Sequence, residues 1–493
     1  MPQSGKRRAA KSFGMLVAAA AIGGLPIPGF ANDLPPTPEG AQKLSDVFAT
    51  YLGRPVAGAP SPVTVTVEGA HYAAALDLAN LAAPFSGAGF SIDPAIARYA
   101  LTEQDDGTWR VAGDALPSIS AHFKDATIAY QFEGYRFEGI FDPTLPGFRS
   151  GETRLDKARA EVQATKVSEA LAIGAAHATV AAAPAANGAV SLVAHNEIAD
   201  VSAQVATASD AAATPVSASL QIPTTLADVK IDGAPIRKLL DLWAFVVAHP
   251  SRAEIAANEQ AFKGLLRAAI PVDLKLAEKI EMKQIAVESP QGRLALASAK
   301  LGLAMSNAAG AKGASEYDFA MDGVTWPAGL LSPAFSDLAP TAFNIDVKLS
   351  GLEFGAGAEE AIADMHFDGD GPVISEADRA QISAKAGRTA PLTIDLLPSH
   401  VVAPQIDVVV EGQLHLEGAR PSGVVKVRVR HFDKTVAALK ALGPLASPQI
   451  LGGLALARTL GKAEADDVLV WVGEYSPDGA MKVNGLPLGK APQ

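Results

Sequence analysis

Four carboxylate residues in the last third of the chain are the best candidates for chemistry. Asp364, Asp368, Asp370 and Glu376 flank a glycine turn. Hard carboxylate oxygens near such a turn are typical of calcium sites. If Asp368 and Asp370 take the third and fifth positions of a calcium loop, Gly371 falls at the sixth, where the loop needs glycine.

The other positions of that loop do not fit calcium. His366 falls at the first position and Ala377 at the twelfth, and both positions need a carboxylate. The alternative interpretation is a solvated turn, with Ser375 and Asp378 capping the helix behind it. We favour the turn and predict no metal ligands.

Histidine, serine and glycine patterns give no further support for catalysis. No His-x-x-x-His or His-Glu-x-x-His pair occurs, as a zinc hydrolase would need. Nucleophile elbows, Walker loops and dinucleotide-binding glycine motifs in strand-to-helix context are also missing. We therefore predict no catalytic residues and no cofactor, and a hydrolase assembled from distant residues is the weakest alternative. The nine histidines are scattered: His71, His122, His177, His195, His249, His366, His400, His415 and His431.

The tryptophans allow two interpretations. Trp109, Trp243, Trp326 and Trp471 could stack on a ligand. Large aromatic side chains more commonly contribute to cores, so we interpret them as packing residues.

The N-terminus has the three parts of a secretory signal. Lys6, Arg7, Arg8 and Lys11 precede an apolar run at residues 13–22, and Gly29-Phe30-Ala31 offers a small-x-small exit. A membrane anchor is the alternative, but the run is about half of the roughly 20 residues that a bilayer needs. We predict a signal peptide at residues 1–31, cleaved near Ala31, and a periplasmic protein that is not integral to the membrane.

Charge and cysteine content narrow the function classes. Cleavage after residue 31 would change the formal net charge from −12 to −16. An acidic chain repels phosphate backbones, which argues against nucleic-acid binding. The chain has no cysteine, so disulfides, thiol catalysis and thiolate metal sites are excluded. The fold must therefore rest on its core, for which 48% hydrophobic residues suffice.

Residues 406–488 set the expected architecture. Residues of one parity between 406 and 417 are apolar and those of the other parity are mostly polar, and residues 425–430 alternate valines with basic residues. The apolar set is Ile406, Val408, Val410, Leu414 and Leu416, and the polar set is Asp407, Glu411, Gln413, His415 and Glu417. Period two indicates strands with one buried face. We expect the acidic and the basic strand to pair antiparallel after a turn at residues 418–423. The first strand would span roughly 40 Å, about twice the usual length.

Other segments extend this pattern. Thr37 and Gly53 frame a predicted helix, and alternation predicts strands around residues 63–78, 128–137 and 190–205. A change of phase near Gly351 predicts a β-bulge.

Two segments have the same order of elements. Helices predicted at 236–247 and 253–269 precede Ser289-Pro290-Gln291-Gly292, and helices predicted at 434–442 and 448–460 precede Ser476-Pro477-Asp478-Gly479. Both tetrads suit type I turns. A duplication and a coincidence both explain the match.

We therefore predict an α+β fold of predominantly long antiparallel sheets with packed helix pairs, with two repeated halves if the duplication is real. The expected domains after the signal are 32–222, 223–390 and 391–493.

The C-terminal motif carries a family resemblance. Residues 468–472, the Ser476-Pro477-Asp478-Gly479 turn and residues 483–488 resemble an uncharacterised family of exported Gram-negative envelope proteins, described as a domain of unknown function. More loosely, the chain resembles AsmA-like periplasmic proteins. The resemblance implies a β-rich fold tied to envelope lipid homeostasis or transport. Typical AsmA-like members retain an N-terminal membrane helix, so a bridging role does not follow.

The function that we expect is non-enzymatic. One-faced sheets of this length have more apolar surface than short helices hide, so the face is covered by the chain itself or holds a guest molecule. We expect a periplasmic envelope protein with a lipid or an envelope protein as its partner. A structural or scaffolding protein without a small-molecule ligand is the alternative.

Overall fold

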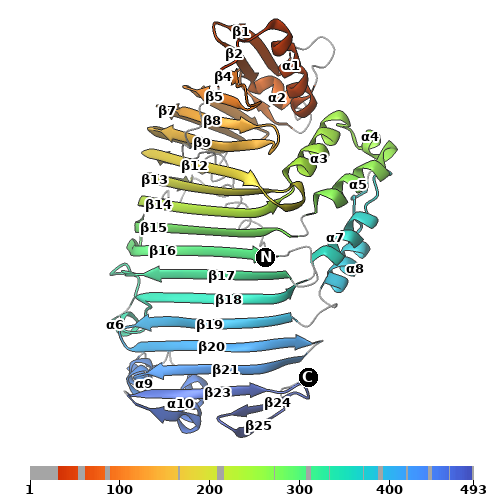
Figure 1. Ribbon diagram of the computed structural model, residues 1–493. Helices are drawn as coiled ribbons and strands as arrows, with labels where there is room; N and C mark the ends of the chain where they lie inside the picture. Colours follow the sequence, from red (N-terminus) through yellow and green to blue (C-terminus); the bar gives the residue numbers. More distant parts are fainter. Residues whose placement is uncertain are drawn as a thin grey trace. The chain divides into compact units, whose positions relative to one another are not determined.

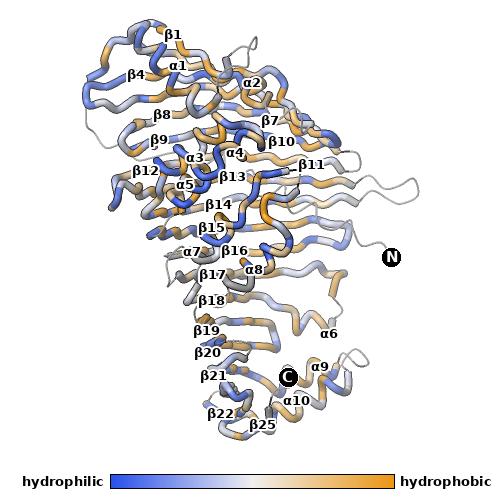
Figure 2. The backbone as a smooth tube through the Cα atoms, turned by 90° about the vertical axis from the view of Figure 1, so that its right-hand side faces the viewer, coloured by the Kyte–Doolittle hydropathy of each residue, from blue (hydrophilic) through white to orange (hydrophobic). Residues whose placement is uncertain are grey.

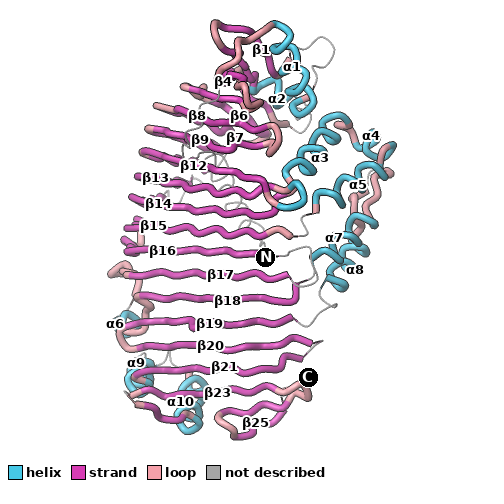
Figure 3. Tube along the Cα trace, viewed as in Figure 1, coloured by secondary structure: helices cyan, strands magenta, loops and turns pink. Residues whose placement is uncertain are grey.

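The structure is a computed structural model of the chain. It describes residues 32–53, 61–83, 89–164, 167–207, 216–270, 273–306, 313–331, 333–352, 354–369, 371–386, 392–417, 420–441, 443, 447–465 and 467–490. The predicted signal peptide lies outside the described residues. Strands make up 56% and helices 24%, and the strand pairs are antiparallel, so the β-rich prediction is confirmed. Figure 3 shows the strands in magenta and the helices in cyan. None of the described helices combines the length and the hydropathy of a transmembrane helix.

The chain forms two compact units. Unit 1 contains Met1–Pro271 and Met365–Val373, and unit 2 contains Val272–Asp364 and Ile374–Gln493. The predicted boundary after residue 222 falls inside a strand of unit 1, and the predicted three-domain division remains a prediction.

Unit 1 is built from β1 to β14 (Figure 1). The helices of unit 1 are α1 (Pro38–Leu52), α2 (Leu78–Ala82), α3 (Ile236–Ala248), α4 (Arg252–Ala257) and α5 (Glu259–Ala269). Its strands are β1 (Val63–Glu68), β2 (His71–Asp77), β3 (Ser91–Ile92), β4 (Ile96–Glu103), β5 (Trp109–Gly113), β6 (Ile119–Phe123), β7 (Ala126–Glu133), β8 (Arg136–Asp142), β9 (Gly147–Leu155), β10 (Lys157–Ala164), β11 (Val167–Ile173), β12 (Ala175–Pro184), β13 (Val190–Thr207) and β14 (Val216–Ala234).

The first helix forms as predicted and covers the first strands. The Thr37 side chain accepts a hydrogen bond from Gly40 N, and Gly53 ends the helix with a φ of 91°. Ala41 on α1 packs with Val63, Tyr72 and other residues of β1, β2 and β4 in one buried cluster. Burial of this apolar stripe is what holds α1 on the sheet.

A line of irregular residues crosses the sheet of unit 1. Gly134 separates β7 from β8, Asp156 separates β9 from β10, Gly174 separates β11 from β12, and Asp200 lies within β13. The breaks are adjacent in space, because Asp156 N donates to Glu133 O and Gly174 N donates to Ala199 O. We call this line the seam.

The apolar residues change parity at the seam. On the side of the seam where β12 pairs with β13, Val180 opposes Ala194, and both residues are even-numbered and buried. On the other side of the seam, where β11 pairs with β13, Leu171 opposes Ala203, and both residues are odd-numbered. A shift of one residue moves a strand's side chains to the other face, and an irregular residue at the same place compensates for it. The seam therefore keeps the apolar residues of both halves on one side.

The seam predicts a specific sensitivity at Asp200. Its φ is 52°, in the left-handed region that asparagine and aspartate tolerate and β-branched residues do not. We expect Asp200→Val to lower the free energy of unfolding by about 1–2 kcal/mol, and Asp200→Asn to leave it nearly unchanged. Urea unfolding of both variants tests this. Equal stability of the valine variant and the parent would contradict the strained backbone.

Unit 2 is built from antiparallel strands that pair in sequence order from β15 to β21, after which β21 pairs with β23 (Figure 1). Its helices are α6 (Pro333–Ser336), α7 (Phe354–Ala363), α8 (Glu376–Ala386), α9 (Phe432–Ala441) and α10 (Pro448–Leu460). Its strands are β15 (Lys275–Ser289), β16 (Gly292–Ser306), β17 (Gly313–Asp322), β18 (Ala342–Leu352), β19 (Leu392–Ala403), β20 (Ile406–Glu417), β21 (Arg420–Arg430), β22 (Lys462–Glu464), β23 (Val468–Tyr475), β24 (Ala480–Val483) and β25 (Leu486–Lys490).

The predicted acidic and basic strands are β20 and β21. They pair antiparallel, and Glu411 lies 2.9 Å from Arg428 across the pair. The predicted turn at 418–423 was too long, because β21 begins at Arg420 and its residues already pair with β20. The bulge predicted near Gly351 is confirmed, since the register of β17 and β18 shifts there and Gly351 has a φ of 87°.

The helix pairs and the turns match the predictions from the sequence in most details. Ser251 and Glu254 form a capping box at the start of α4, and Asn258 splits the second predicted helix into α4 and α5. The tetrad that begins at Ser289 closes the β15–β16 hairpin, and Gly479 N donates to Ser476 O in the second tetrad.

Candidate functional site

The segment that was compared with a calcium loop contains no group of three or more candidate metal ligands among its described residues. Asp364 follows α7, Asp368 is exposed in the next loop, and Glu376 is the first residue of α8. Asp370 lies outside the described residues. The predicted cap is confirmed, because Asp378 N donates to Ser375 Oγ at 3.1 Å. The sequence interpretation as a capped turn is therefore the one that the described residues support.

Several scattered histidines contact a carboxylate. Sequence spacing does not show these pairs, because the partners lie between 7 and 36 residues away and meet through strand pairing or loops. Each pair links two segments of the chain, which is a structural role. The pairs are His122–Asp93, His177–Glu152, His195–Asp228, His400–Asp407 and His431–Asp467.

One of these pairs has the order of a nucleophile relay. His122 lies 3.3 Å from the Thr127 hydroxyl and 3.0 Å from Asp93. A relay needs a base that is held in one orientation by a third group. The His122 and Asp93 side chains are 41% and 58% exposed, so water competes for both. We assign this contact to the pairing of β6 and β7 rather than to catalysis.

The tryptophans divide between core and surface. Trp109 packs in the α1 cluster, and Trp471 packs against α9 and α10. Trp243 on α3 and Trp326 after β17 are 48% and 37% exposed. The packing interpretation is therefore confirmed for the first two.

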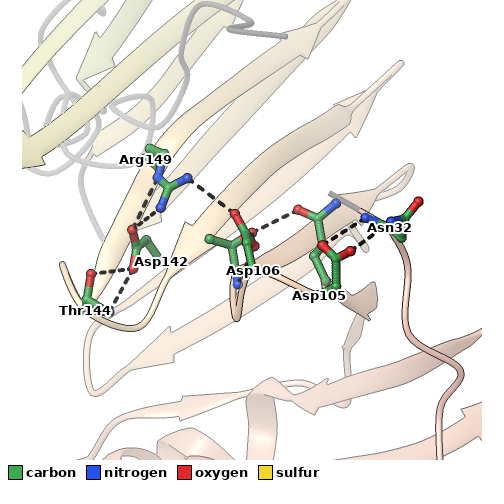
Figure 4. Close-up of polar contacts among 8 residues, drawn as sticks. Asn32, Asp105, Asp106, Asp142, Thr144 and Arg149 are labelled. Carbon is green, nitrogen blue, oxygen red and sulfur yellow. Dashed lines mark hydrogen bonds and ion pairs between the residues drawn. The ribbon is translucent and has the colours of Figure 1, made fainter. Parts of the chain in front are cut away.

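Arg149 and Thr144 join a cluster of aspartates in unit 1 (Figure 4). Asp142 is buried, and Arg149 lies between it and Asp106, 2.6 Å and 3.6 Å away. Thr144 donates to Asp142 through both its backbone N–H and its hydroxyl. Burial alone would raise the pKa of Asp142, but the hydrogen bonds from Thr144 and Arg149 outweigh it and lower the pKa. Thr144 lies in the β8–β9 turn and Arg149 lies on β9, so their hydrogen bonds to Asp142 fix this turn.

The Asp142 cluster predicts a pH-dependent loss of stability. An aspartate with a lowered folded-state pKa stabilises the fold above its ordinary pKa of 3.8, and that contribution disappears as the pH falls through the folded-state value. At pH 7 we expect Asp142→Asn to lower the free energy of unfolding by about 1–3 kcal/mol. Unfolding curves between pH 7 and pH 2 should converge for variant and parent at the acidic end. A difference that stays constant with pH would contradict this assignment.

The most unusual surface of the described chain is one side of the unit 2 sheet. Directly opposed residues of antiparallel strands point to the same side. Ile280, Leu301, Phe319 and Ile345 oppose one another in one row across β15 to β18. We call this side the apolar face, made of Leu276, Ile280, Met282, Leu301, Leu303, Met305, Tyr317, Phe319, Met321, Phe343, Ile345, Val347, Leu349, Ile394 and Leu396.

The centre of the apolar face is exposed. Leu301, Tyr317 and Ile345, on three neighbouring strands, are 48%, 47% and 45% exposed. Polar residues in these rows are Glu278 on β15 and the buried Ser315 on β17. Contiguous apolar surface of this kind marks sites of ligand or partner binding.

Among the described residues, α9 and α10 cover the far end of the same side. Val429 and Leu469, in strands β21 and β23, form a buried cluster with Phe432 of α9, and Leu454 of α10 packs against it. The part of the side that lies on β15 to β18 is the part with half-exposed side chains.

The opposite side of the sheet is polar. Ion pairs such as Lys300–Glu281 and Arg430–Asp407 join neighbouring strands there. Hydrophobic and hydrophilic residues alternate along the strands in Figure 2, as this division requires. A hollow of about 400 Å³ lies on this side beside Lys426, Lys462 and Glu474, and its lining mixes charged side chains with Val470 and Val472.

Asp346 on the polar side has an environment that is unfavourable for its charge. It lies directly opposite Asp318, and its Oδ1 atom is buried without a hydrogen-bond partner in the described structure. Burial, with the nearby charges of Glu316 and Asp318, raises its pKa above the ordinary value.

Asp346 predicts a stabilising substitution. A raised folded-state pKa means that the ionised group weakens the fold as the pH rises above the ordinary value of 3.8 and through the folded-state value. We expect Asp346→Asn to raise the melting temperature at pH 7 and to have no such effect below pH 3.8. Thermal melts of variant and parent at both pH values test this, with Asp395→Asn on β19 as a control from the same side. A lower melting temperature for Asp346→Asn at pH 7 would show that the charge is compensated.

Comparisons with known proteins add no information on identity: no protein family, no curated protein and no solved structure matches the chain.

Proposed function

We propose that this protein is a non-enzymatic periplasmic envelope protein that binds the acyl chains of a lipid on the apolar face of unit 2. The observation that carries the proposal is the half-exposed patch of Leu301, Tyr317 and Ile345 on three adjacent strands. Water contact with such side chains is unfavourable, and an aliphatic guest that covers them gains roughly 0.8 kcal/mol for each buried methylene group.

The dimensions of the face suit an acyl chain. The row from Ile280 to Ile345 crosses β15 to β18, which is three strand spacings. At about 4.8 Å per spacing the row is roughly 14 Å long. One leaflet of a bilayer contributes about 15 Å of hydrocarbon, so a single acyl chain matches the row.

The cellular setting of the proposal rests on the sequence. The predicted signal at residues 1–31 supports export to the periplasm, and the resemblance to envelope proteins, including AsmA-like proteins, supports a link with lipids. The α+β class and the duplication of two halves belong to the same proposal and are supported by the matching order of helices and Ser-Pro-x-Gly turns.

A scaffolding function without a small-molecule ligand is the second candidate. Ile450 and Leu456 on α10 are 52% and 61% exposed, although α10 also packs on the sheet through Leu454. An exposed apolar helix surface is what an envelope protein partner would bury.

A lipid-binding experiment separates the two candidates. We expect lipid to co-purify with the protein in native mass spectrometry, and a fluorescent fatty acid to bind. Leu301→Asp and Ile345→Asp should each weaken binding of the fatty acid about tenfold, because a charge replaces a side chain worth about 1.5–3 kcal/mol of burial. Val424→Asp is the matched control, because Val424 is 46% exposed on the polar side.

Two results would contradict lipid binding. The first is a protein that carries no lipid and takes up no fatty acid, which would leave the scaffolding function. The second is equal loss of binding in the Val424 control, which would show that the effect does not come from the apolar face.

A further inference from the structure

The loop that resembles a calcium site is occupied by a cation of the protein itself. We call the described residues of its central segment, 365–369 and 371–373, the strap; they belong to unit 1. The Arg252 guanidinium on α4 donates to three backbone carbonyls of the strap. Nε lies 2.9 Å from Phe367 O, Nη1 lies 2.5 Å from Gly371 O, and Nη2 lies 3.3 Å from His366 O.

The strap is fixed by a second, apolar contact. Phe367 is 8% exposed, and its ring meets Phe262 of α5 edge-on with 5.4 Å between the ring centres. The ring centre of Phe262 in turn lies 5.7 Å from the ring centre of Phe245 on α3. His366 N donates to Val373 O, which closes the strap on itself.

Local structure places Arg252 for this role. The capping box of Ser251 and Glu254 fixes the start of α4, so Arg252 is the first residue of the helix. A guanidinium presents its donors in a rigid planar fork, which suits several fixed acceptors at once. Backbone carbonyls are also the ligands that a calcium loop would offer to its metal.

We propose that Arg252 is the resident cation of the strap and acts as a latch. The strap is closed, without any metal, while the guanidinium holds the three carbonyls and Phe367 lies among the phenylalanines. When the guanidinium leaves, Phe367 moves into solvent and the strap opens. The latch therefore sets whether the strap is held against α4 and α5 or is free.

Chymotrypsin cleavage after Phe367 of the full chain measures strap opening, because a protease needs the phenylalanine exposed. We expect Arg252→Ala to increase the cleavage rate at least about tenfold, since it removes three hydrogen bonds from a charged group. Arg252→Lys should give an intermediate rate, because an ammonium lacks the fork. Millimolar methylguanidinium should slow cleavage of the alanine variant and leave the parent unchanged.

Arg237→Ala is the matched control. Arg237 on α3 also donates to a backbone carbonyl, Pro143 O, at 2.8 Å, but it does not touch the strap, so its cleavage rate after Phe367 should equal the parent's. The proposal is overturned if Arg252→Ala is cut as slowly as the parent, if methylguanidinium gives no protection, or if a chelator accelerates cleavage of the parent. The lysine variant provides the same test if the alanine variant does not fold. None of these readouts depends on lipid binding.

Discussion

The apolar side of the long strands must be shielded from water, and this requirement determines where helices pack in both units. Backbone pairing determines where each strand lies, but it does not remove apolar side chains from water. In unit 1, α1 does so for the first strands. In unit 2, α9 and α10 do so for β20 to β23. Between β15 and β18 the side chains of Leu301, Tyr317 and Ile345 remain half exposed, and this incomplete coverage is the physical basis for the proposed ligand.

Two aspartates show how neighbouring groups determine the pKa of one residue type. Asp142 receives hydrogen bonds from Thr144 and Arg149, and its pKa falls although it is buried. Asp346 faces Asp318 and has an oxygen without a donor, and its pKa rises. The difference lies in the donors supplied, since both carboxylates stand on or next to β-strands.

The sequence predicted local features far better than spatial neighbours. The ends of β20, the caps of α1 and the bulge at Gly351 follow from alternation, capping chemistry and a change of phase. The seam was missed, although the parity change between Ile198 and Val201 signals it, because a single strand does not show that its neighbours break at the same place. Arg252 was missed because its carbonyl partners lie more than 100 residues away and carbonyls leave no mark in a sequence. The apolar face was foreseen as a surplus of one-sided strands, but its exposed centre depends on where helices pack.

The seam also constrains how this chain tolerates insertions and deletions. Losing Asp200 alone would turn the remainder of β13 over, placing Ala203 and Val205 on the polar side while β11 and β14 kept theirs. To return the apolar residues of all these strands to one side, one residue would also have to be deleted at Gly174 and one in β14. Length changes at the seam are thus tolerated only as a coordinated set across adjoining strands, whereas the hairpin tips can vary one at a time.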